Sequence, residues 1–293
     1  MLPESGSQLF RFCQLDFSVP VGPADGRYLA RSGDSDLDVI VIQTLGAARR
    51  SSVRGRRPKR AEPGATDPEP VAISRVTVID SDGFENEEAA TGWLDRCRKD
   101  ESQRERSAAR ALGIVNRAIH AHRVSAGDPY ERELTRKHAL TTRLGYGAGD
   151  DVVEGRWRAA YLLPQPRVRV GRRQMLSPQE HLAAILSGRS PIHPSEDLAL
   201  RARLDLDQDR TRQAALQLRA ATDALAAELA ASGDEQAASK TREALSNVRR
   251  TVDELAAAAL AGDLDPERTS SLAGLLDDVE RILRRRRHAE GPR

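Results

Sequence analysis

The chain has 293 residues, a formal net charge of +2, and a composition in which hydrophobic residues make up 39% but aromatic residues only 3%. This length allows two domains, and a mainly aliphatic core favours packed helices over a large aromatic-lined pocket. The net charge is too small to steer one kind of partner across the whole surface. No apolar run approaches the roughly 18 residues that a membrane span needs, and no secretion signal opens the chain, so we expect a cytoplasmic protein with no membrane attachment.

The first 43 residues carry the alternation typical of strands. Strands are predicted over 15–21, 26–32 and 37–46, with a Gly, Pro and Asp turn between the first two. The pattern resumes at 71–79. Between them, residues 47–70 lose apolar content and gain Arg, Pro, Gly and Ser, which predicts a disordered basic insertion.

After Phe84 the apolar period becomes helical. Helices are predicted over 85–99 and 107–123, followed by a strand over 139–147 that ends in a glycine turn with positive φ angles. Residues 155–163 fit a short helix or a strand. Residues 1–174 are therefore expected to form an α+β domain, a small antiparallel or mixed sheet with helices on one face.

Residues 175–293 are expected to form a separate all-α domain. A helix is predicted from the capping residue Ser177 to 186, and three later segments share apolar spacing of three and four residues. The short connections at 232–234 and 262–265, the second with Asp265 as a cap, make successive helices antiparallel. This predicts a three-helix bundle or a helical-hairpin region with its core at about 208–287.

One short stretch suggests catalysis. In GDSDLDVIVI, residues 33–42, Asp36 and Asp38 precede an apolar run that predicts a strand buried on both faces. The segment resembles the nucleotidyltransferase superfamily, in which two alternating acids on a strand hold a divalent metal against a nucleoside triphosphate. The resemblance implies a metal-dependent catalytic role for Asp36 and Asp38. The other interpretation is a polar hairpin turn whose acids bind their own backbone.

Other candidates for metal or cofactor binding are weak. Cys13 and Cys97 are far apart and lie in no CxxC or Cys/His motif, which argues against a disulfide framework or a zinc site. His120 and His122, two apart on a predicted helix, diverge by about 200°. We therefore predict no metal site and no cofactor.

Basic residues gather in two blocks, Arg284–Arg287 and a longer run before position 61. Such a run can bind nucleic acid or an acidic protein without a preformed pocket, or serve as a solvated loop. The basic residues of the longer run are Arg49, Arg50, Arg54, Arg56, Arg57, Lys59 and Arg60.

Three functions remain open. The first is a non-catalytic interaction or scaffold module whose C-terminal helices bind a protein partner or a second copy, because heptad-like helices are present and no coherent active-site set is found. The alternatives are weak nucleic-acid binding through the arginine-rich segments and a nucleotidyltransferase-like activity that uses Asp36 and Asp38.

Overall fold

A computed structural model describes residues 8–32, 36–46, 71–166, 172–231 and 235–289. The chain divides into two compact units, residues 1–167 and 168–293, and each is described by itself. The predicted insertion at 47–70, with its seven basic candidates, lies outside the described residues.

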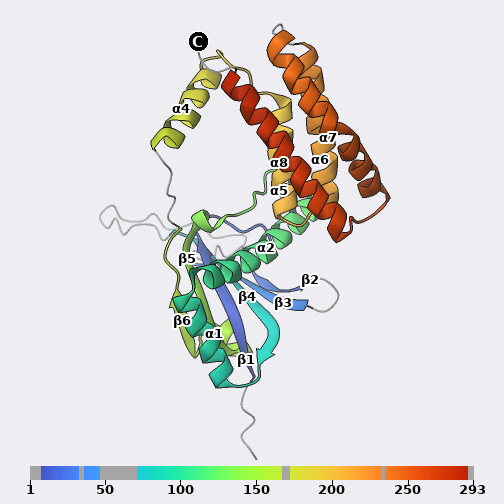
Figure 1. The fold of residues 1–293 in the computed structure, drawn as a ribbon. Helices are drawn as coiled ribbons and strands as arrows, with labels where there is room; N and C mark the ends of the chain where they lie inside the picture. The colour runs from blue at the N-terminus through green and yellow to red at the C-terminus, as the bar shows by residue number, and fades with distance from the viewer. Residues whose placement is uncertain (1–7, 33–35, 47–70, 167–171, 232–234, 290–293) are drawn as a thin grey trace, which may run out of the picture. The chain divides into compact units, whose positions relative to one another are not determined.

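Six antiparallel strands form the sheet of the first unit, in the order β2-β3-β4-β1-β5-β6 (Figure 1). This confirms the antiparallel form of the predicted sheet. The predicted first strand is misplaced, because β1 ends before Pro20, which has no N–H to donate to a neighbouring strand. The strands are β1 (Leu9–Phe17), β2 (Gly26–Ser32), β3 (Asp36–Leu45), β4 (Ile73–Phe84), β5 (Ala139–Ala148) and β6 (Ala159–Leu162).

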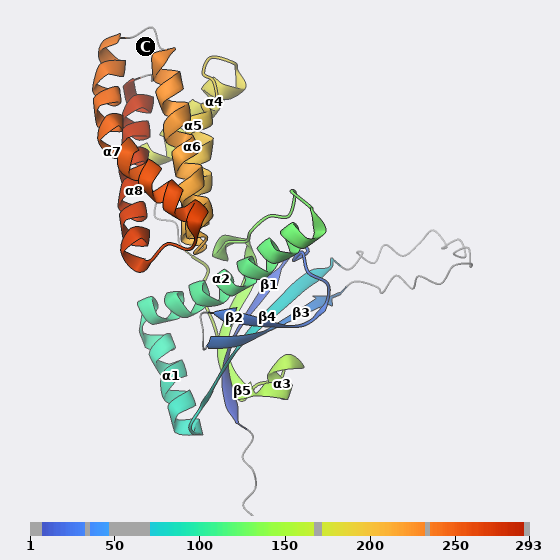
Figure 2. The ribbon, with the colours of Figure 1, turned by 90° about the vertical axis from the view of Figure 1, so that its right-hand side faces the viewer.

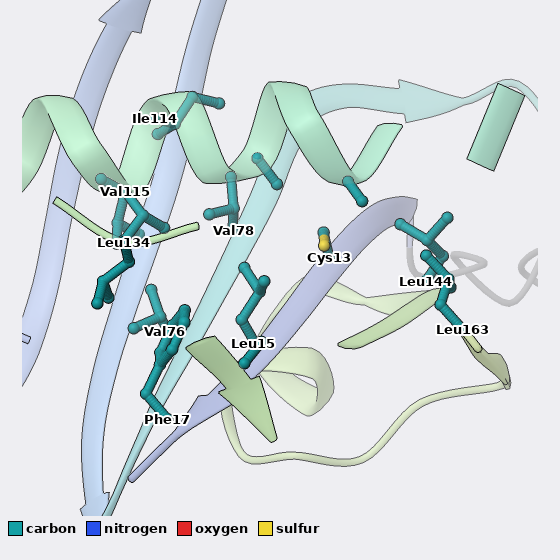
Figure 3. Packing of buried hydrophobic residues seen from close by; sticks show 14 of the residues in the cluster. Cys13, Leu15, Phe17, Val76, Val78, Ile114, Val115, Leu134, Leu144 and Leu163 are labelled. Carbon is teal, nitrogen blue, oxygen red and sulfur yellow. The ribbon is translucent and has the colours of Figure 1, made fainter. Parts of the chain in front are cut away.

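Two helices, α1 (Glu87–Lys99) and α2 (Glu101–Ala126), cover one face of this sheet (Figure 2). The Asn86 side chain accepts a hydrogen bond from Ala89 N at 2.8 Å and begins α1, while Asp100 ends α1 and caps α2. Residues from β1, β4, β5 and α2 then pack into one hydrophobic core (Figure 3).

The opposite face is partly covered as well, which corrects the expectation of helices on one face only. The short helix α3 (Gly149–Val153) places Val152 and Val153 against Phe12, Val41 and Ile79. Because Ile40 and Ile42 belong to the core under α1 and α2 while Val41 lies on the α3 side, β3 is buried on both faces, as its sequence predicted.

Glycines near the end of β5 serve close packing rather than a turn, so the predicted glycine turn is wrong. The strand continues through Gly145 and Gly147 to Ala148. A Cβ on Gly145 would lie 2.4 Å from the Ala159 carbonyl oxygen and 2.7 Å from Phe12 Cζ. Glycine at this position lets β6 and the Phe12 ring approach the strand.

The second unit is helical. One core cluster takes residues from α5 (Pro194–Asp207), α6 (Thr211–Ala230), α7 (Glu235–Ala261) and α8 (Pro266–Ala289). The predicted three-helix arrangement omitted α5, whose core residues are alanines with a weak apolar signal, Ala199 and Ala202. Before these lies α4 (Arg172–Leu186), which begins five residues earlier than Ser177. Among the described residues, no helix is long and apolar enough to cross a membrane.

Candidate functional site

Asp38 lies in a charged cluster between the sheet and α2. The β3–β4 register pairs Asp38 with Asp80, so the two carboxylates stand side by side on the face that carries α2. Arg110 on α2 donates hydrogen bonds to both carboxylate oxygens of Asp38, at 2.9 and 3.2 Å, and its Nη1 lies 3.6 Å from Asp80 Oδ2. Arg110 thus links the helix layer to two strands.

The cluster is buried at its centre and cationic around it. The Asp38 side chain is 0% exposed, and burial raises its pKa although Arg110 acts in the opposite direction. Arg11 Nε lies 3.4 Å from Asp80 Oδ2, and its guanidinium carbon lies 5.4 Å from the centre of the Phe84 ring. Each carboxylate therefore has an arginine partner.

The two sequence candidates occupy different settings. Asp36 is the first residue of β3, paired with Ser32, and its side chain lies outside the described set. Asp38 is a strand residue bound by an arginine 72 positions away, so the interpretation of its carboxylate as part of a self-satisfied polar turn is wrong.

A pocket of about 230 Å³ opens beside this cluster. Arg11, Arg106 and Arg110 line it together with Asp80 and the buried thiol of Cys13, whose pKa burial raises to about 12. A thiol with this pKa stays protonated at neutral pH, which makes it a poor nucleophile. The guanidinium groups present donors that suit a small anion.

A second charged cluster lies on the other face of the sheet. Asp16 accepts hydrogen bonds from Arg75, Thr141 and Arg143, the shortest of them at 2.7 Å. Burial raises the pKa of Asp16, but these hydrogen bonds outweigh burial and bring the pKa down to about 2. This cluster joins β1, β4 and β5, and two arginines compensate the charge of Asp16.

A groove of about 700 Å³ runs between the edge strand β2 and α2. Its lining is mostly apolar and includes Tyr28, Leu29, Ala118 and Ala121. Tyr28 pairs in register with Ile40 of the core under α2, whereas Leu29, which is 72% exposed, pairs with Val39 on the α3 side of the sheet. We call this surface the β2–α2 groove.

The helical unit has its own polar cluster. Ser195 donates its backbone N–H (3.0 Å) and its hydroxyl (2.6 Å) to the carboxylate of Glu228, which also accepts a hydrogen bond from Arg286. The His193 ring lies beside Arg286, with a ring nitrogen 3.0 Å from Nη2. Because Ser195 is 0% exposed and its hydroxyl is bound to the acid directly, the cluster fastens the start of α5 to α6 and α8.

The histidine pair and the second basic block serve local contacts. His122 Nε2 lies 3.1 Å from the Gly22 carbonyl oxygen, whereas His120 Nδ1 lies 2.7 Å from Arg123. No group of three or more His, Cys, Asp or Glu able to hold a metal occurs in the described part of the chain. In the block at the end of α8, Arg284, Arg286 and Arg287 are paired with acids.

Sequence reasoning missed Arg110, Asp80 and Arg11. A local signal existed only for Asp80, an acid that directly follows the apolar part of β4. Nothing in the α2 sequence distinguishes Arg110 from the other arginines of that helix. The β2–α2 groove was missed because its existence depends on how β2 and α2 are placed relative to each other, which local sequence patterns do not show.

The chain was compared with protein-family models, with curated proteins and with solved structures, and none of the three comparisons finds a match.

Proposed function

We propose that the chain is a non-catalytic protein-interaction or scaffold module, and that its C-terminal helices bind a protein partner or a second copy. The observation that carries the proposal is a set of exposed leucines on α5 and α6. Leu200 is 67% exposed, Leu204 44% and Leu216 37%. Exposed aliphatic side chains of this size are common where a surface is covered by another protein.

The arrangement of these leucines supports the proposal. Leu200 and Leu204 are four residues apart and share one face of α5, while Ala199 and Ala202 of the same helix lie in the core. Helices α5 and α6 are joined by the short connection 208–210, which makes them antiparallel neighbours. Leu216, in the second turn of α6, therefore belongs to the same hairpin.

The polar clusters point in the same direction. Asp38, Asp16 and Glu228 are each bound by an arginine of their own unit. Compensated pairs of this kind stabilise contacts between elements, and they leave the carboxylates less available for acid or base work.

The test uses the full chain and measures its molar mass by light scattering together with the proteins that it retains on a column. The double variant Leu200→Asp/Leu204→Asp should lose self-association or the retained partner. The matched control is Leu260→Asp, because Leu260 is 63% exposed but lies at the end of α7. A monomeric wild-type chain that retains no partner, or equal behaviour of both variants, contradicts the proposal.

A further inference from the structure

We infer that the first unit binds a small organic carboxylate in the pocket of about 230 Å³ beside the ion pair of Asp38 and Arg110. In this complex the carboxylate group lies between Arg11 and Arg106, and the apolar body of the ligand covers the inner wall. We call this space the arginine pocket. It belongs to the first unit, whereas the proposed function concerns leucines of the second unit, so the inference goes beyond that function.

The arginine pocket is built from both layers of the first unit. Arg106 and Arg110 line it from α2, where their spacing of four residues puts them on one face of the helix. Arg11 lines it from β1 and is paired in register with Tyr146, which belongs to the core under α1 and α2. Directly paired strand residues share one face of a sheet, so Arg11 lies on the helix side. Guanidinium groups therefore reach the arginine pocket from the sheet as well as from α2.

Arg11 and Arg106 both have donors that the protein does not fully use. Arg11 Nε is buried and makes no hydrogen bond within the described part of the chain, although Asp80 Oδ2 lies 3.4 Å away. Arg106 donates a hydrogen bond to the neutral side chain of Gln103, and no acid among the described residues forms an ion pair with it. A buried donor without an acceptor costs free energy, and a bound carboxylate supplies acceptor oxygens for both arginines.

Charge selects an anionic ligand. Three arginines line the arginine pocket, and Asp80 is the one acid among its described lining residues. Asp80 Oδ2 already lies 3.4 Å from Arg11 Nε and 3.6 Å from Arg110 Nη1, while Arg110 is also bound by Asp38. The acids are thus compensated, and Arg106 leaves an excess of positive charge at the pocket. This excess attracts an anion and repels a cationic ligand.

The size and the inner wall of the arginine pocket define the rest of the ligand. Its volume lies below the range of about 300–1,000 Å³ that is usual for drug-sized molecules, so the ligand is small. The inner wall is apolar and buried, and it includes Val78 and Leu144 of the core in Figure 3 together with Trp93 and Ala111. Phosphate would leave this wall uncovered. A monocarboxylate with a short aliphatic or aromatic body contacts both the arginines and the wall.

The experiment titrates a panel of monocarboxylates into the full chain and measures binding by calorimetry. The panel contains straight-chain, branched and aromatic acids, each with its neutral amide, and inorganic phosphate is the probe for a simple anion site. We expect at least one acid to bind, and its amide to bind about tenfold more weakly or less, because the amide forms no charge-assisted hydrogen bonds with the arginines. Phosphate should also bind more weakly than that acid.

Two pairs of variants place the bound acid. Arg106→Met should weaken its binding about tenfold, because one guanidinium group is lost. Arg96→Met is the matched control, since Arg96 is exposed on α1 and does not line the arginine pocket, and its effect should stay below about twofold. Ala111→Leu fills the inner wall and should also weaken binding about tenfold, whereas Ala109→Leu, exposed on α2 outside the pocket, should not.

The inference is overturned if no acid of the panel binds, if the amides bind as tightly as the acids, or if phosphate binds as tightly as the best acid. It is also overturned if Arg106→Met binds like the wild type, or if Arg96→Met loses as much affinity as Arg106→Met. The arginine pair of variants keeps the test decisive if Ala111→Leu folds poorly. Self-association and partner retention by the leucines of α5 and α6 are not measured here, so the two proposals can fail separately.

Discussion

Arg110 and Asp38 form a bidentate ion pair that joins α2 to β3, with hydrogen bonds of 2.9 and 3.2 Å. The carboxylate is fully buried, whereas the arginine side chain is 43% exposed. Arg110 therefore compensates the desolvated charge of the Asp38 carboxylate, while its own guanidinium group stays partly hydrated.

Replacement of Arg110 by Met should lower the free energy of unfolding by about 3 kcal/mol at pH 7, because it leaves the buried Asp38 carboxylate without its main partner. Since burial already raises the pKa of Asp38, protonation can remove the uncompensated charge. The deficit should therefore shrink as the pH falls through the raised pKa of Asp38. Urea unfolding of the wild type and of Arg110→Met between pH 4 and 8 measures this difference in the free energy of unfolding.

The control for this prediction is Arg106→Met, since Arg106 lines the same pocket but is exposed and donates a hydrogen bond to the neutral side chain of Gln103. Its effect should stay within about 0.5 kcal/mol. A loss in Arg110→Met that is the same at every pH would show that packing, and not the Asp38 charge, is responsible.

The position of the strand that holds Asp38 could be predicted from the sequence, but the ion pair that Asp38 forms could not. Alternation and an apolar run are local signals, and they located β2 and the buried half of β3 correctly. The partner of Asp38 is one of 46 basic residues and lies 72 positions away, so no periodicity could identify it. The omission of α5 from the predicted bundle has a different cause. The buried residues of α5 include alanines, which carry little apolar signal in the sequence.

Asp16 should contribute about 2 kcal/mol of stability at neutral pH, since hydrogen bonds from arginine and threonine lower its folded pKa from 3.8 to about 2. This contribution is present above the unfolded pKa and is lost as the pH falls from about 4 to about 2. Asp16→Asn should therefore be less stable than the wild type at pH 5 to 7, and the gap should close in acid.

The exposed ion pair of Asp95 and Arg98 is the comparison for Asp16, because the Asp95 side chain is 46% exposed. Asp95→Asn should change the free energy of unfolding by less than about 1 kcal/mol. Equal losses for Asp16→Asn and Asp95→Asn would contradict the importance of the Asp16 cluster.

Two glycines should respond in opposite directions to the same substitution. Gly145→Ala should destabilise the protein by about 1–3 kcal/mol, because the new Cβ would meet the Ala159 backbone at 2.4 Å and β6 would have to move. Gly113→Ala, inside α2 with nothing within 4 Å of the added Cβ, should stabilise it by about 0.5–1 kcal/mol. Thermal unfolding of the two variants compares them, and a stable Gly145→Ala would show that β6 adapts freely.

Glu228 is expected to act as a cap for α5 supplied by another helix. Burial raises its pKa, but hydrogen bonds from Ser195 and Arg286 outweigh burial, so the folded pKa lies below its ordinary value. Its stabilising effect is thus present at neutral pH and declines as the pH falls below the unfolded pKa. Ser195→Ala should cost about 1–2 kcal/mol, since it removes one buried hydrogen bond and leaves the acid underbonded.

A double-mutant cycle separates this cap from simple packing. If Glu228 acts through Ser195, then Ser195→Ala should cost much less when Glu228 is already Gln, and the coupling should be about 1 kcal/mol or more. Arg203, which pairs with Asp277 and Glu280 elsewhere on the same helices, supplies the independent site. The effects of Arg203→Met and Ser195→Ala should add, so coupling between them as large as that between Ser195 and Glu228 would indicate general loosening of the bundle instead of a cap.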